Sequence, residues 1–205
     1  MRNLLALPGL AVIGLMALGE PIADTRPLDW NVDARHTEIN FSVRHFFTPV
    51  TGSFGDYEID LDFDPEYPEK SSVRVKVAVA SIDTGNEKRD NHLRSADWFD
   101  AEKYAYMTFE SSSVKRVAKN RFLAKGTLSI KDAKRQIELP ITLLGVQEIP
   151  EQMREMLGGV GRVASFQADA QLDRRDFGVG VGSWAETVIV GAGVDITIVV
   201  EANRP

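Results

Sequence analysis

The chain has 205 residues, a formal net charge of −6 and no cysteine. This length suits one domain with a sizeable core, and the negative charge argues against nucleic-acid binding, which needs a concentrated basic surface. The absence of cysteine excludes disulfides, thiolate metal sites and a cysteine nucleophile.

The first 19 residues have the pattern of a signal peptide. Arg2 precedes an apolar stretch over 4–18 that ends in small residues suited to cleavage. The stretch is shorter than the ~20 residues of a membrane-spanning helix, and a retained anchor is the alternative. We therefore expect a signal peptide at 1–19, a mature domain over 28–203, and a periplasmic or secreted location.

Alternation of apolar and polar residues predicts about eight strands in the remainder of the chain. The pattern is clearest over 57–64, where Tyr57, Ile59, Leu61 and Phe63 alternate with acidic residues. Similar stretches follow over 36–46, 72–79, 107–111, 122–130, 137–143, 166–172 and 194–200. Because few helices separate them, we expect an all-β fold, an eight-stranded antiparallel up-and-down barrel rather than a βαβ arrangement.

A helical segment interrupts the strands over 84–99. Residues 84–87 have the form of a capping box, with the Thr84 hydroxyl at the cap, and predict a short polar helix. A helix this short is marginal alone, so we expect it to dock through Leu93, Trp98 and Phe99. The segment would then be a plug that closes one end of the barrel.

A second interruption predicts a small helix over 150–158. Pro150 suits a helix start, and the spacing of Met153, Met156 and Leu157 predicts one buried apolar face. Since methionine adapts to irregular apolar surfaces, one hypothesis makes this helix a lid over the mouth of the barrel.

An interior bounded by eight strands either fills with side chains or holds one slender ligand, and alternation does not decide between these outcomes. An apolar wall disfavours a charged metabolite and favours a hydrocarbon chain, in which each buried CH₂ contributes ~0.8 kcal/mol. The expected lining residues are Phe41, Val43, Ile59, Leu61, Val75, Val77, Phe109, Leu128, Ile130, Leu139, Ile141, Phe166, Ile196 and Ile198.

Polar residues gather around the predicted plug and in a later motif. They form either a hydrogen-bond network that fixes the plug or a site for a ligand head group. The three histidines do not predict a metal site, because an unbroken strand would place His36 and His45 on opposite faces. The cluster comprises Asn86, Arg89, Asp90, His92, Arg175 and Asp176.

A series of different short motifs lies between Trp30 and Ala202. They include Phe41-Ser42-Val43-Arg44-His45, Thr51-Gly52-Ser53-Phe54, Ala80-Ser81-Ile82-Asp83-Thr84-Gly85-Asn86, Arg89-Asp90-Asn91-His92-Leu93, Gly126-Thr127-Leu128-Ser129-Ile130-Lys131 and Arg175-Asp176-Phe177-Gly178. In order and number they resemble the YceI-like family of secreted, lipocalin-like polyisoprenoid-binding proteins. The resemblance implies an eight-stranded barrel, a periplasmic setting, a long isoprenoid or similar amphiphile in the cavity, and no catalysis.

We therefore expect a periplasmic carrier for a long apolar chain, such as a polyprenyl or isoprenoid quinone tail, with no catalytic residue, no metal and no required cofactor. Two alternatives stay open. One is a ligand-free structural or stress-related barrel that binds a partner, and the other is a lipid-modifying enzyme. A membrane cytochrome, a lipid-handling protein and a second copy in a homodimer are the partners under consideration.

Overall fold

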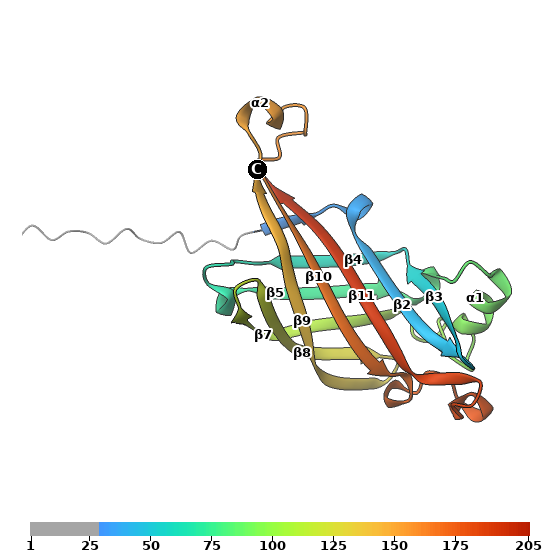
Figure 1. The fold of residues 1–205 in the computed structure, drawn as a ribbon. Helices are drawn as coiled ribbons and strands as arrows, with labels where there is room; N and C mark the ends of the chain where they lie inside the picture. Colours follow the sequence, from blue (N-terminus) through green and yellow to red (C-terminus); the bar gives the residue numbers. More distant parts are fainter. Residues whose placement is uncertain (1–28) are drawn as a thin grey trace, which may run out of the picture.

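Within residues 29–205, which are those that the computed structural model describes, eleven strands form one antiparallel sheet that closes into a barrel (Figure 1). The predicted signal peptide lies outside the described residues. The strands are β1 (Asp29–Val32), β2 (Glu38–His45), β3 (Thr48–Phe54), β4 (Tyr57–Asp62), β5 (Ser72–Ala78), β6 (Ile82–Asp83), β7 (Tyr106–Ala118), β8 (Arg121–Ile130), β9 (Ala133–Glu148), β10 (Arg162–Asp173) and β11 (Val190–Arg204). The helical segments are η1 (Ala34–His36), η2 (Pro68–Lys70), η3 (Val79–Ser81), α1 (Glu87–Arg94), α2 (Glu151–Arg154), η4 (Arg174–Phe177) and η5 (Gly182–Ala185).

Eight chain paths make the barrel, because β1 with β2 and β3 with β4 each form one interrupted path and the two-residue β6 pairs only with the end of β3. Only η1 and its flanking residues separate β1 from β2, and both strands border β11, with Val32 opposite Ala202 and Glu38 opposite Val199. In the same way, two residues separate β3 from β4, which pair with β2 and β1. The pairing of β1 with both β4 and β11 closes the ring. The predicted eight-stranded antiparallel barrel is confirmed.

The alternating strands place charges outside and apolar residues inside. On β4, Leu61 is buried while Asp60 is exposed, and the Asp60 carboxylate accepts a hydrogen bond from Arg74 of β5 at 2.9 Å. The same arginine lies 3.5 Å from Glu110 of β7. These exposed ion pairs contribute little individually, so burial of the inner face stabilises the sheet.

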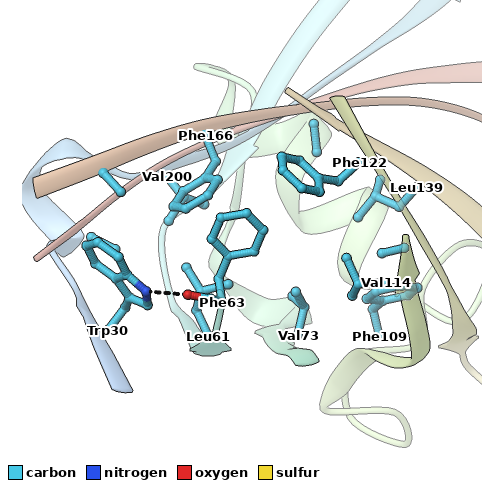
Figure 2. Packing of buried hydrophobic residues seen from close by; sticks show 14 residues of the cluster. Trp30, Leu61, Phe63, Val73, Phe109, Val114, Phe122, Leu139, Phe166 and Val200 are labelled. Carbon is cyan, nitrogen blue, oxygen red and sulfur yellow. Dashed lines mark hydrogen bonds between the residues drawn. The ribbon is translucent and has the colours of Figure 1, made fainter. Parts of the chain in front are cut away.

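One end of the barrel is filled by aromatic side chains (Figure 2). The Phe63 ring packs edge-on against Phe122 and Phe166, with centroid separations of 5.0 Å to each. The indole N–H of Trp30 donates a 2.9 Å hydrogen bond to the carbonyl of Phe63, which fixes the start of β1 over this group. Edge-to-face pairs contribute about 0.5–1.5 kcal/mol beyond their area burial. We call this end of the barrel the packed end.

The expected capping box is wrong in detail. Asn86, not Thr84, caps α1, since its side-chain oxygen accepts the N–H of Arg89 at 3.0 Å. Thr84 instead donates its backbone N–H to the buried carboxylate of Asp90 at 3.0 Å, and its hydroxyl donates to the same oxygen. The carboxylate that accepts from Thr84 is therefore that of Asp90, at the end of the first turn of the helix, rather than that of Glu87.

The helix near 150–158 also differs from expectation. The α2 helix has four residues and lies beyond the packed end, on the side of the molecule opposite α1 (Figure 1). Met153, Met156 and Leu157 are all exposed, Met156 by 74%. The spacing predicted a buried face, but β9 and β10 carry this loop beyond the barrel, where no other element within residues 29–205 covers it.

Candidate functional site

The other end of the barrel, which we call the hollow end, contains a cavity. Its volume is about 190 Å³, counted as the space open to the centre of a water molecule. Inward side chains of β2, β3, β5 and β7 to β11 form its wall, and Trp98, Phe99, Phe177 and Val179 lie at its end. The exposed surface of this wall is entirely apolar, so the site suits hydrocarbon rather than charge.

The predicted lining residues divide between the two ends of the barrel. Four of the fourteen lie away from the cavity: Leu61 and Phe166 are buried in the aromatic core of the packed end, and Ile59 and Ile141 pack against that core. Alternation correctly gives the face of each residue but not its height along the barrel axis. The ten that line the cavity are Phe41, Val43, Val75, Val77, Phe109, Leu128, Ile130, Leu139, Ile196 and Ile198.

Sequence reasoning missed several residues of the wall. Phe54 and Phe177 stand inside motifs that carry the family resemblance, so those motifs were the available signal. Met107 and Ile137 continue the alternation of recognised strands. Val190 begins β11 after an irregular segment and gave no periodic signal.

The predicted plug covers the end of the cavity. Trp98 is buried with Phe177 and Val179, and the Phe99 ring packs edge-on against Phe54 at 6.2 Å. The ammonium of Lys131 donates to the backbone carbonyl of Trp98 at 2.8 Å, which ties the plug to the β8–β9 hairpin. The plug is thus held by packing and by hydrogen bonds to its backbone.

Arg174 is buried under the loop that completes this cover. Its guanidinium donates to the carbonyls of Val179 at 2.8 Å, Gly191 at 2.9 Å and Val190 at 3.0 Å. It also stacks on Trp98, 5.2 Å from the ring centroid. Burial lowers the pKa of Arg174, although a guanidinium stays charged at neutral pH. The residue organises the backbone around the hollow end.

None of the six residues of the predicted polar cluster lies in the cavity wall. Arg89 donates to the hydroxyl of Thr84 at 2.7 Å and to its carbonyl at 2.8 Å, and Asn86 and Asp90 hold α1 as described above. His92 lies 3.3 Å from the Asp97 carboxylate. These contacts favour the network interpretation over a head-group site.

Arg175 and Asp176 lie in η4, apart from α1. Arg175 pairs with the carboxylate of Asp173 at 2.6 Å, and this hydrogen-bonded pair lowers the pKa of Asp173 to about 2. Asp176 is exposed. The pair stabilises the turn that carries Phe177 into the cavity wall.

His36 does not occupy the predicted strand position. It lies in η1, where its Nδ1 is 3.1 Å from Asp33 and 3.4 Å from Glu201. Arg35 also pairs with Asp33 at 3.2 Å, and lowers the pKa of that carboxyl to about 2. Asp33, Arg35, His36 and Glu201 thus form an ion-pair network at the surface, at the break between β1 and β2.

Comparison with known proteins agrees with this geometry. A family profile described as "YceI-like domain" matches residues 30–202. A UPF0312 protein of Azotobacter vinelandii is 30% identical over 166 residues, covering 80% of this chain and 81% of that protein. The crystal structure of Burkholderia cenocepacia BcnA superposes with a TM-score of 0.74 at 25% identity, covering 83% of this chain and 99% of that one.

A more distant structure shares the fold. It is described as a polyisoprenoid binding domain from Saccharophagus degradans, and it matches with a TM-score of 0.62 at 14% identity, covering 86% of this chain and 98% of that one.

Proposed function

Because the chain belongs to the YceI-like family, we propose that it is a periplasmic, non-catalytic carrier that holds a long apolar chain in the hollow end of its barrel. The chain would be a polyisoprenoid, the tail of an isoprenoid quinone or a similar amphiphile. The observation that carries this proposal is the cavity, whose exposed surface is entirely apolar. The distant structure described as a polyisoprenoid binding domain supports the same ligand class.

The size of the cavity limits how the ligand is held. An engineered apolar cavity of about 150 Å³ binds benzene, so a cavity of about 190 Å³ takes a short segment of an isoprenoid. A micromolar affinity needs about 8 kcal/mol, or roughly ten buried methylenes at ~0.8 kcal/mol each before the costs of association. Binding of a long chain therefore requires the plug or the neighbouring wall to move outward.

The indole N–H of Trp98 favours a ligand that also carries oxygen. It is buried and has no hydrogen-bond partner within the described part of the chain, and Trp98 lines the cavity. An unpaired buried donor costs about 1–3 kcal/mol. The N–H contributes no exposed surface to the cavity, so a hydroxyl or carbonyl oxygen would reach it only when the plug moves outward. Such a contact would remove the cost, which suits an amphiphile better than a pure hydrocarbon.

Native mass spectrometry with isoprenoid alcohols from geraniol to solanesol tests the proposal. We expect one ligand per chain and an affinity that rises with chain length, because each added unit buries more methylenes. An isoprenoid alcohol should bind more tightly than the hydrocarbon of equal length, and Trp98→Phe should reduce that preference. Failure of every isoprenoid to bind would refute the proposal, and turnover of a bound lipid would favour the enzyme instead.

A further inference from the structure

Two loops at the hollow end expose large apolar side chains side by side. Phe46 and Phe47 form the β2–β3 turn and are 51% and 92% exposed, while Val188 and Ile189 precede β11 and are 76% and 42% exposed. The Phe46 N–H donates to the carbonyl of Ile189 at 2.6 Å, so the loops form one surface. We call these four residues the apolar tip.

The backbone of the turn makes two aromatic residues there unexpected. His45 pairs with Thr48, which leaves Phe46 and Phe47 as a two-residue loop. Phe46 has a φ of 51°, in the left-handed region where such turns strongly favour glycine or asparagine. Phe47, at 92% exposed, buries almost nothing in the fold. The Phe46 ring packs edge-on against His45 at 4.9 Å, but Phe47 has neither a turn preference nor packing to account for it, so we infer that its role is outside the folded chain.

The apolar tip continues the wall of the cavity. Val190, which follows Ile189 directly, lines the cavity and pairs with His45 in the sheet. Val43, two residues before His45, also lines the cavity. Figure 1 shows the β2–β3 turn and the loop before β11 at the same end of the barrel as α1, opposite α2. An apolar surface outside the molecule is thus adjacent to the apolar space inside it.

The charge near the apolar tip also contrasts with the rest of the chain. Residues 44–55 and 187–194 contain Arg44 and His45 and no carboxylate, in a chain of net charge −6. Carboxylates flank these stretches at Asp56, Glu186 and Asp195, and another lies on the plug at Asp97, which pairs with His92. Exposed aromatic and aliphatic side chains beside a basic group match an anionic lipid surface, where apolar insertion and charge attraction add.

We propose that the apolar tip docks into the interface of a lipid bilayer that contains anionic lipid, and so places the hollow end against the membrane. The purpose that we assign to this docking rests on the proposed function: with the hollow end against the membrane, an isoprenoid could pass between bilayer and cavity without crossing water. Binding itself depends only on the four exposed side chains and the neighbouring charge.

Sedimentation with vesicles of phosphatidylcholine and phosphatidylglycerol tests the docking. The double variant Phe47→Ser/Val188→Ser removes the two most exposed side chains of the tip, and we expect its partitioning onto vesicles to fall at least tenfold. The matched control is Met153→Ser/Met156→Ser, which removes exposed apolar residues beyond the packed end and should partition like the unmodified protein. The unmodified protein should bind less to vesicles of phosphatidylcholine alone, and its binding to the mixed vesicles should weaken at high salt.

Other results would overturn the docking proposal. The first is that the unmodified protein does not bind vesicles, and the second is that only the Met153→Ser/Met156→Ser control loses vesicle binding. The third is that the unmodified protein self-associates and does not bind vesicles, while the tip variant is monomeric. That result would assign the tip to contact with a second copy of the chain. Loading the protein with solanesol from detergent separates the test of docking from the test of the cavity. In native mass spectrometry, the tip variant should still bind solanesol. A protein that docks on vesicles but never loads an isoprenoid would refute the proposed ligand and leave the docking surface standing.

Discussion

Two alanines on β10 provide a direct test of the division between a packed and a hollow end. Ala168 and Ala170 lie two residues apart on the same inward face, but Ala168 is buried in the aromatic core whereas Ala170 lines the cavity. Replacement of each by leucine adds the same three carbons at neighbouring heights in the barrel. The structure predicts opposite effects on the free energy of unfolding.

The magnitudes follow from what each leucine meets. At position 170 the added carbons occupy empty apolar space, which contributes about 2 kcal/mol from burial, less about 0.5–1 kcal/mol for leucine side-chain entropy. Ala170→Leu should therefore stabilise the protein by roughly 1–2 kcal/mol. Ala168→Leu inserts the same volume into close-packed side chains and should destabilise it by about 1–3 kcal/mol.

Both changes in the free energy of unfolding can be measured by guanidinium denaturation of protein that has been refolded free of lipid. An unchanged slope of that free energy against denaturant concentration would show that the denatured state is unaffected. Ala170→Leu should also weaken isoprenoid binding, because it fills the space that the ligand needs. Equal destabilisation by both substitutions would mean that the barrel is solid throughout, and the interpretation of the cavity as a binding site would be wrong.

Three further predictions concern stability. Phe63→Ala should cost about 3–5 kcal/mol in guanidinium unfolding, since it removes the centre of the aromatic core; a cost below ~1 kcal/mol would contradict the packing described. Asp90→Ala should cost about 1–3 kcal/mol and loosen α1 in hydrogen exchange, because the donors of Thr84 lose their buried acceptor; unchanged exchange would argue against this role. The pKa of Asp173 is lowered to about 2 from 3.8, so its pairing with Arg175 stabilises the fold above pH ~4 and is lost as the pH falls towards ~2. Asp173→Asn should accordingly lower stability by less than ~1 kcal/mol near neutral pH, with a difference from the unmodified protein that shrinks below pH 4; a difference that grows in acid would refute this assignment.

The sequence was sufficient to predict the barrel because the period of two is a local property of each strand. It identified which side of the strand Val75 and Ile59 face, and both do face inward. It could not distinguish their heights, because height depends on register between strands distant in sequence. As a result, the sequence does not distinguish Val75, which lines the cavity, from Ile59, which packs against the aromatic core of the packed end.

The errors in the helical segments have a related cause. The spacing of Met153, Met156 and Leu157 describes an apolar stripe, but only the tertiary structure determines whether another element covers it. Thr84 and Asn86 are both good cap residues, and the choice between them depended on the buried Asp90, six residues beyond Thr84. The apolar tip gave no periodic signal, because a two-residue turn is too short for one.

Occupancy of the hollow end by an isoprenoid chain in the native protein tests the proposed function most directly. Native mass spectrometry of protein isolated from its own host without detergent, followed by solvent extraction, measures this occupancy. We expect one isoprenoid per chain, at near-stoichiometric occupancy, and its loss from the Ala170→Leu variant. Protein that is isolated empty, or that carries only a small polar molecule, would show that the cavity is not an isoprenoid site.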